Sequence, residues 1–199
     1  MLASLAFIVA AYLIGSISFA VVTSKAFRLP DPHTYGSGNP GATNVLRTGN
    51  KAAAALTVLG DGAKGWLAVW LAQRFGADFE VLPWTVPAVA VAVFLGHLYP
   101  AFHGFAGGKG VATAAGIVFA LHWPLGAMLA AIWLVMAVGF RISSLAALAT
   151  ATLMPLGMFY ALGNSLAAWA MVPIALLLFW RHRVNIRQLI AGKERPIGR

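Results

Sequence analysis

Cysteine is absent from this chain of 199 residues, and only five residues are Asp or Glu. No disulfide framework and no thiolate metal site can therefore form. Charged residues of both signs make up 10% of the sequence, whereas hydrophobic residues make up 60% and the mean hydropathy is +0.81. So few charges could not cover the surface of a soluble domain of this length. The composition predicts a protein embedded in a lipid bilayer.

Several catalytic signatures are missing as well. Asp61 is the one carboxylate expected inside the membrane, so we predict no magnesium site of the kind that phosphatidyl-alcohol transferases use. No His precedes an Asp by five residues, as in the usual acyltransferases that draw on acyl-CoA or acyl-carrier protein, and no Ser-His-Asp set is legible. The GGKG at 107–110 is not a nucleotide-binding loop, because His103 and Gly110 replace the required Gly and Ser/Thr. We expect chemistry by positioning and charge stabilisation, with no metal ion and no cofactor.

Apolar stretches follow one another along the chain. A spanning helix needs about 20 mainly apolar residues. The fourth stretch is short and ends at His122-Trp123-Pro124, so five to seven spans fit the pattern, and seven keeps the charge distribution consistent. The first stretch has no basic residue before it, which favours a retained helix over a cleaved signal peptide. The stretches are 2–22, 54–73, 83–101, 110–122, 123–140, 144–162 and 165–180.

The net charge of +9 tests this arrangement. With seven spans and the N-terminus outside, the outer segments hold only Arg74 among the basic residues, whereas the inner segments hold nearly all the rest, including the tail. Cytoplasmic segments carry such an excess of Lys and Arg. In a membrane protein the excess points to topology and anionic lipids or substrates, not to nucleic acid. We predict an all-α bundle of seven transmembrane helices in a single domain, 1–199, with a cytoplasmic C-terminus.

Three polar clusters would then share the cytoplasmic side. The first, 36–47, reads GSGNPGATNVLR, in which glycines and short side chains can turn backbone amides toward an anion and Arg47 can grip a phosphate. A turn-rich connector with a headgroup-binding Arg is the plainer alternative. The residues of this cluster that we expect to contact a ligand are Ser37, Gly38, Asn39, Thr43, Asn44 and Arg47.

The second cluster, 96–116, places Gly107, Gly108 and Gly110 around Lys109 just before an apolar helix. Amides at a helix N-terminus attract phosphate, and Lys adds a charge. The alternative is a glycine-rich hinge with a Lys that reaches the headgroups. His97, at the inner end of the third span, is a candidate base or phosphate donor, with an ordinary interfacial histidine as the other interpretation.

The third cluster, 181–198, taken alone resembles a basic stop that binds anionic lipid. Asn185 and Glu194 do not fit that role, and Glu194 is expected to orient an Arg or Lys. Inside the second span, Asp61 and Lys64 stand one helical turn apart, so they can neutralise each other, or Lys64 can contact a substrate phosphate. The convergence of the three clusters on one side predicts a single anion-binding site.

GSGNPGATNVLR, GHLYPAFHGFAGGKGVATAAG and HRVNIRQLIAGKE, in this order, resemble the PlsY family of bacterial acyl-phosphate:glycerol-3-phosphate acyltransferases over essentially the whole chain. The resemblance implies a seven-helix enzyme of the bacterial inner membrane that makes lysophosphatidic acid from acyl phosphate and glycerol 3-phosphate and releases phosphate. It implies that Ser37 and Arg47 are essential and that the glycines around Lys109 hold the acyl phosphate. From the third motif it implies roles for His182, Asn185 and Glu194.

Two other classes are compatible with parts of the pattern. A transporter of organic phosphates would use similar binding groups, but it should show internal repeats and binding groups at mid-membrane depth. A noncatalytic protein that binds anionic lipid would explain the basic tail but has no need of the first two clusters. Beyond the two substrates and membrane lipid, the sequence indicates no obligate protein partner.

Overall fold

A computed structural model describes residues 1–197, and every regular element in that range is a helix. Gly198, which ends the third predicted cluster, and Arg199 lie outside the described residues. The elements are α1 (Leu2–Gly15), α2 (Phe19–Ala26), α3 (Ala42–Leu46), α4 (Lys51–Phe75), α5 (Thr85–Leu98), the 3₁₀ turn η1 (Ala101–His103), α6 (Val111–Leu121), α7 (Trp123–Phe140), α8 (Ser143–Leu162), α9 (Leu166–Arg181) and α10 (Arg183–Ile190).

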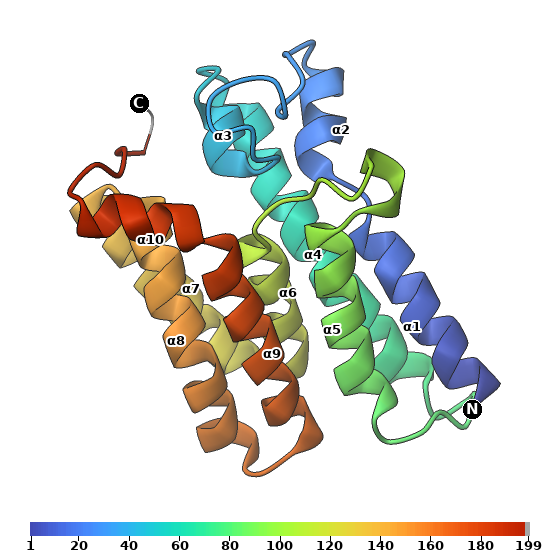
Figure 1. Cartoon of the computed structure of the whole chain (residues 1–199). Helices are drawn as coiled ribbons and strands as arrows, with labels where there is room; N and C mark the ends of the chain where they lie inside the picture. The colour runs from blue at the N-terminus through green and yellow to red at the C-terminus, as the bar shows by residue number, and fades with distance from the viewer. Residues whose placement is uncertain (198–199) are drawn as a thin grey trace.

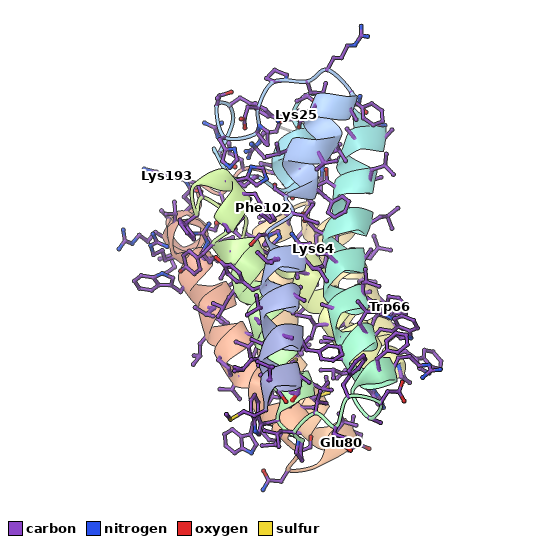
Figure 2. All side chains as sticks on the ribbon, turned by 90° about the vertical axis from the view of Figure 1, so that its right-hand side faces the viewer. Lys25, Lys64, Trp66, Glu80, Phe102 and Lys193 are labelled. Carbon is purple, nitrogen blue, oxygen red and sulfur yellow. The ribbon has the colours of Figure 1, made fainter. Side chains whose placement is uncertain are left out.

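The long helices form one bundle with two chemically different ends (Figure 1). Within it α4 packs on α6, α1 packs on α5, and α8 packs between α7 and α9. The N-terminus lies at one end, whereas α2, α3, α10 and the C-terminal segment lie at the other, which we call the polar end (Figure 1). Figure 2 places Lys25 and Lys193 toward the polar end and Glu80 at the opposite end. All three predicted clusters therefore meet at one end of the molecule.

The first apolar stretch is not the continuous helix that the hydropathy predicts. It consists of α1 and α2, bent by 42° around Ser16, Ile17 and Ser18. The break frees backbone carbonyls, and buried Lys64 of α4 donates to the carbonyl of Ile17 at 2.7 Å. The Ser16 hydroxyl donates to the carbonyl of Tyr12 at 2.9 Å. Lys64 thus satisfies a carbonyl at the break, whereas the Tyr12 carbonyl keeps its helical hydrogen bond from the backbone N–H of Ser16.

The other six predicted stretches each coincide with a helix to within a few residues. Among the described residues, three helical segments are both long and apolar enough to cross a membrane, Thr85–His103, α7 and α8, and the bent pair α1 and α2 makes a fourth. The helices α6 and α9 are apolar but shorter. The short fourth stretch ends where the His122 side chain caps α7, accepting from the backbone N–H of Leu125 at 3.3 Å.

Glycines allow the closest helix contacts. A Cβ on Gly15 of α1 would lie 2.1 Å from the backbone oxygen of Val93 in α5. A Cβ on Gly116 of α6 would lie 1.9 Å from the backbone oxygen of Gly62 in α4. Small residues at helix contacts are typical of membrane bundles, where close backbone approach replaces the hydrophobic driving force available in water. These contacts hold α1 against α5 and α6 against α4, and residues of α4, α5 and α6 line the site.

The outer face of the bundle is strongly apolar. Val135 and Val138 of α7 are 71% and 70% exposed, and Leu156 and Tyr160 of α8 are 62% and 95% exposed. A contiguous surface of this kind would drive association in water, but it is what lipid-facing helices present. The arrangement therefore agrees with the membrane location that the composition predicts.

Candidate active site

A cavity of about 330 Å³, the main cavity, runs from the polar end into the bundle. All three sequence clusters contribute to it, as the convergence of the clusters predicts. Its polar residues are Ser37, Asn39, Thr43, Asn44, Arg47, Asp61, His97, Lys109, Ser143, Ser144, Thr150, His182, Asn185, Glu194 and Arg195. Its apolar residues lie mostly on α6, α7 and α8 and include Val118, Leu129, Ala130, Trp133, Ala147, Ala151 and Met154.

Asn44 organises the first cluster. Its side-chain oxygen accepts from the backbone N–H of Ser37 and from the guanidinium of Arg47, both at 3.0 Å. Its amide group donates to the carbonyls of Pro32 at 2.9 Å and Tyr35 at 3.2 Å. Because Asn44 is only 2% exposed, these bonds occupy its side chain inside the protein. Asn44 thus holds Ser37 and Arg47 together at the cavity mouth.

The remaining residues of this cluster separate into two places. Ser37 is exposed at the main cavity, and its hydroxyl accepts from the backbone N–H of Asn39 at 3.4 Å. The Thr43 hydroxyl donates to Ser143 at 3.5 Å and so joins the cluster to the start of α8. Gly38 has a φ of +65° and lies on the outside of the loop, in a shallow pocket beside His33 and not in the main cavity.

Two glycines of the second cluster, Gly107 and Gly108, pack so closely against His97 that no side chain fits there. A Cβ on Gly108 would lie 2.3 Å from Nε2 of His97, and a Cβ on Gly107 would lie 2.1 Å from the His97 carbonyl oxygen. Gly110, with a φ of +87°, caps α6 and lines the main cavity together with Lys109. Gly107 and Gly108 lie behind that wall. They let the loop approach α5 closely enough for Lys109 to face the cavity.

Arg181 fastens the glycine loop from the other side. Its Nε donates to the carbonyl of Gly108 at 3.1 Å and its terminal nitrogen donates to the carbonyl of Gly107 at 2.5 Å. The guanidinium also lies 5.8 Å from the ring centre of Tyr99. The planar fork of Arg suits two adjacent acceptors. Sequence reasoning missed this role, because Arg181 looks like any other basic residue of the tail.

A chain of hydrogen bonds joins the second and third clusters. The ammonium of Lys109 donates to Asn185 at 2.6 Å, the amide of Asn185 donates to Glu194 at 2.7 Å, and Ser144 donates to the same Glu194 oxygen at 2.6 Å. Burial lowers the pKa of Lys109 to about 8, although the negative charge of Glu194 opposes the shift. Lys109 is therefore a cation at neutral pH that sits close to its titration point.

His182 is buried where α9 meets α10. Its Nδ1 donates to the carbonyl of Leu178 at 2.8 Å, because a carbonyl can only accept. Burial, and next the positive charge of Lys109, lower the pKa of His182 to about 4. His182 is therefore neutral at pH 7, and its Nε2 is an acceptor at the main cavity.

Asp61, Lys64 and His97 form a buried group at the inner wall. The ammonium of Lys64 lies 2.9 Å from Oδ1 of Asp61, and Nδ1 of His97 lies 3.5 Å from the same oxygen. Asp61 and His97 line the main cavity, but Lys64 does not. Lys64 contacts Asp61 and the carbonyl of Ile17, which is the pairing that one of the two sequence-based interpretations expects, and its contact with a substrate phosphate stays a prediction.

The apolar half of the main cavity was not anticipated residue by residue. Trp133 of α7 and Met154 of α8 face it together with small residues of α6. Single apolar residues carry no signal in an apolar helix, since lipid-facing and cavity-facing positions look alike. A basic mouth that continues into an apolar cleft suits a ligand with an anionic head and a hydrocarbon chain.

The comparisons with known proteins decide the family. The model of the family described as glycerol-3-phosphate acyltransferase matches residues 5–192. The chain belongs to this family. Among curated glycerol-3-phosphate acyltransferases, that of Cupriavidus pinatubonensis is 60% identical over 99% of this chain and 98% of its own length. That of Ralstonia pickettii is also 60% identical, over 98% of this chain and 95% of its own length.

Solved structures of a glycerol-3-phosphate acyltransferase agree with the fold. The crystal structure of PlsY, described as an integral membrane glycerol 3-phosphate acyltransferase in its glycerol 3-phosphate form, has a TM-score of 0.90 and 36% identity, over 98% of this chain and 96% of that chain. The same enzyme in its lysophosphatidic acid form has a TM-score of 0.88 at 36% identity. The resemblance of the three motifs to the PlsY family is confirmed, and the chain is an integral membrane protein of that fold.

Proposed function

We propose that this protein transfers a fatty acyl group from acyl phosphate to the sn-1 hydroxyl of glycerol 3-phosphate. The hydroxyl oxygen forms the new ester bond to the acyl carbon, and the bond from that carbon to the phosphate oxygen breaks. Lysophosphatidic acid and inorganic phosphate are the products. The observation that carries the proposal is the main cavity, which joins a cationic mouth to an apolar cleft within a family of glycerol-3-phosphate acyltransferases.

The main task of such an enzyme is to hold two anions side by side. Two unit charges about 4 Å apart repel by roughly 4 kcal/mol at an effective dielectric constant of 20. Arg47 and Lys109 both line the main cavity and can offset this repulsion. We assign Arg47 to the phosphate of glycerol 3-phosphate, with Asn39 and Thr43 beside it. Lys109 stands between the two phosphates, held by Asn185.

The glycine loop is assigned to the acyl phosphate. Arg181 binds the carbonyls of Gly107 and Gly108, and the Gly108 amide donates to the carbonyl of His97, so we assign the leaving phosphate to the first amides of α6, which follow Gly110 at the cavity wall. The hydrocarbon chain would then follow the apolar wall past Leu129 and Trp133. We assign Ser37 the donation of a hydrogen bond to a phosphate or to the developing oxyanion, and we assign neutral His182 the acceptance of one from a glycerol hydroxyl.

Two groups compete for the proton of the attacking hydroxyl. A substrate phosphate can take it, because acyl phosphate already carries a good leaving group. His97 is the alternative base, but it is 7% exposed and its Nδ1 is turned to Asp61. Substitution His97→Ala distinguishes them: a loss of more than about 10²-fold in turnover at unchanged affinity would favour His97. A smaller loss would favour the phosphate.

We further propose seven spans in the bacterial inner membrane, with the N-terminus outside and the site open to the cytoplasm. The direct test of function uses purified protein with glycerol 3-phosphate and either acyl phosphate or acyl-CoA. Lysophosphatidic acid should form when the donor is acyl phosphate and should not form when the donor is acyl-CoA. Formation only from acyl-CoA would overturn the donor, and trapping of an acyl group on Ser37 would replace direct transfer by a covalent route. Glycerol 3-phosphate counterflow without turnover would favour the transporter alternative, which family membership does not support.

A further inference from the structure

α10 turns away from α9 at His182 and lies across the polar end of the bundle (Figure 1). None of its eight residues is buried. Val184 is 54% exposed and Ile190 is 83% exposed, although both are apolar. Trp180, at the end of α9 just before the turn, is 59% exposed, and exposed Trp residues mark the boundary between lipid and water. These exposures are the ones expected of a helix at the membrane interface.

The charged side chains on the exposed side of this segment are all cationic. Arg183, Arg187 and Lys193 are exposed, and so is Arg195, which also lines the main cavity. The single acid between residues 183 and 197, Glu194, is half-buried and bonded inward to Asn185 and Ser144. Arg183 also stacks on the Trp180 ring at 4.9 Å. Exposed apolar residues next to uncompensated Arg residues are complementary to an anionic lipid surface, which offers both hydrocarbon and negative charge.

The inner side of the same helix carries a residue of the candidate site. Asn185 is half-buried and accepts from Lys109 at 2.6 Å. A helix of eight residues is too short to be stable by itself, and Arg183 and Arg187, one turn apart, repel each other. Counter-charge on the outside would remove this repulsion and hold the helix. Negative charge on the outer side of α10 would therefore stabilise the position of Asn185.

We propose that α10 docks on anionic headgroups of the surrounding membrane, and that this contact keeps Asn185 on Lys109. Acyl transfer is then higher in a bilayer that contains anionic lipid. The dependence of turnover rests on the proposed function, whereas docking of α10 does not, and the two can be measured separately.

The absence of cysteine makes a single-site label possible. Ile190→Cys carries an environment-sensitive fluorophore in nanodiscs of phosphatidylcholine, alone or mixed with phosphatidylglycerol. We expect blue-shifted emission, and turnover higher by roughly five- to tenfold, in the mixed lipid, within the usual range of coupling between two sites. The double variant Arg183→Gln, Arg187→Gln should lose most of both differences. Lys25→Gln, Lys51→Gln removes the same charge from exposed residues elsewhere and should keep both.

Equal emission in the two lipids would overturn the proposed docking. The exposed face of α10 would then be a candidate binding surface for an acidic protein. An equal loss in the two double variants also overturns it, because a general surface potential would then suffice. A label that responds in a protein with no acyl transfer would support docking and refute the proposed function. Acyl transfer with no response of the label or of the rate to anionic lipid would support the proposed function and refute docking.

Discussion

Arg181→Lys tests whether the hydrogen bonds from Arg181 hold the glycine loop at Gly107 and Gly108 in its active position. Arg181 makes two charge-assisted hydrogen bonds to the carbonyls of Gly107 and Gly108, and the single ammonium of Lys cannot reproduce the planar fork that makes both. One such bond is worth about 1.5–3 kcal/mol. Because Arg181 is partly exposed, we take about 1.5–2 kcal/mol, which corresponds to a fall of roughly 10- to 30-fold in kcat/KM.

The assay is phosphate release from acyl phosphate at saturating glycerol 3-phosphate, with KM for acyl phosphate measured separately. The loss should appear mainly in that KM, since the loop amides are assigned to the donor. Arg183→Lys is the matched control, because Arg183 is next but one in sequence and, within residues 1–197, its guanidinium donates to the carbonyl of Trp180 and stacks on the Trp180 ring. An unchanged kcat/KM in Arg181→Lys, or an equal loss in Arg183→Lys, would show that the two bonds of Arg181 do not hold the glycine loop for catalysis.

Three further predictions concern other parts of the site. The pKa of Lys109 is about 8 and its charged form binds phosphate, so kcat/KM should fall as the pH rises through about 8, and Lys109→Arg should extend the plateau, since Arg stays charged. Gly108→Ala should abolish activity, because the new Cβ would lie 2.3 Å from His97, whereas Gly139→Ala, with no atom within 4 Å, should leave activity unchanged in the same assay. Asp61→Asn should lower the free energy of unfolding by about 3 kcal/mol or more, seen as a fall in Tm on thermal melting in detergent, because it removes the counter-charge of the buried Lys64 cation and leaves it the carbonyl of Ile17, and the further change Lys64→Met should restore part of the loss.

The helices were accessible to sequence reasoning because hydropathy is a local property. α7 coincides with its predicted stretch, 123–140, and α8 differs from 144–162 by one residue. The prediction of one continuous helix over 2–22 was wrong, because the break depends on a distant partner that hydropathy does not consider. The carbonyl freed at Ile17 accepts from Lys64, which lies 47 residues away. A window of local sequence treats Ser16 and Ser18 as ordinary members of an apolar run.

The candidate site divides in the same way. Gly110, Lys109, Asn185 and Glu194 stood out because glycine, charge and amide are rare in an apolar chain, and the structure brings them to one cavity. Their partners did not stand out. Arg181 is one of several tail cations. Asn44 was expected to contact a ligand, and the structure adds that its side chain bonds to Ser37 and Arg47 at the cavity wall.

Composition and local periodicity were enough to predict the membrane class, the order of the helices and the residue types available for holding anions. Which of those residues act together depends on the packing of the helices. Lys109 meets Asn185 across 76 residues, and Arg181 meets Gly107 across 74. Such pairs depend on how the helices pack, and close packing is set by glycine contacts such as Gly116 against Gly62, whose partners no local pattern identifies.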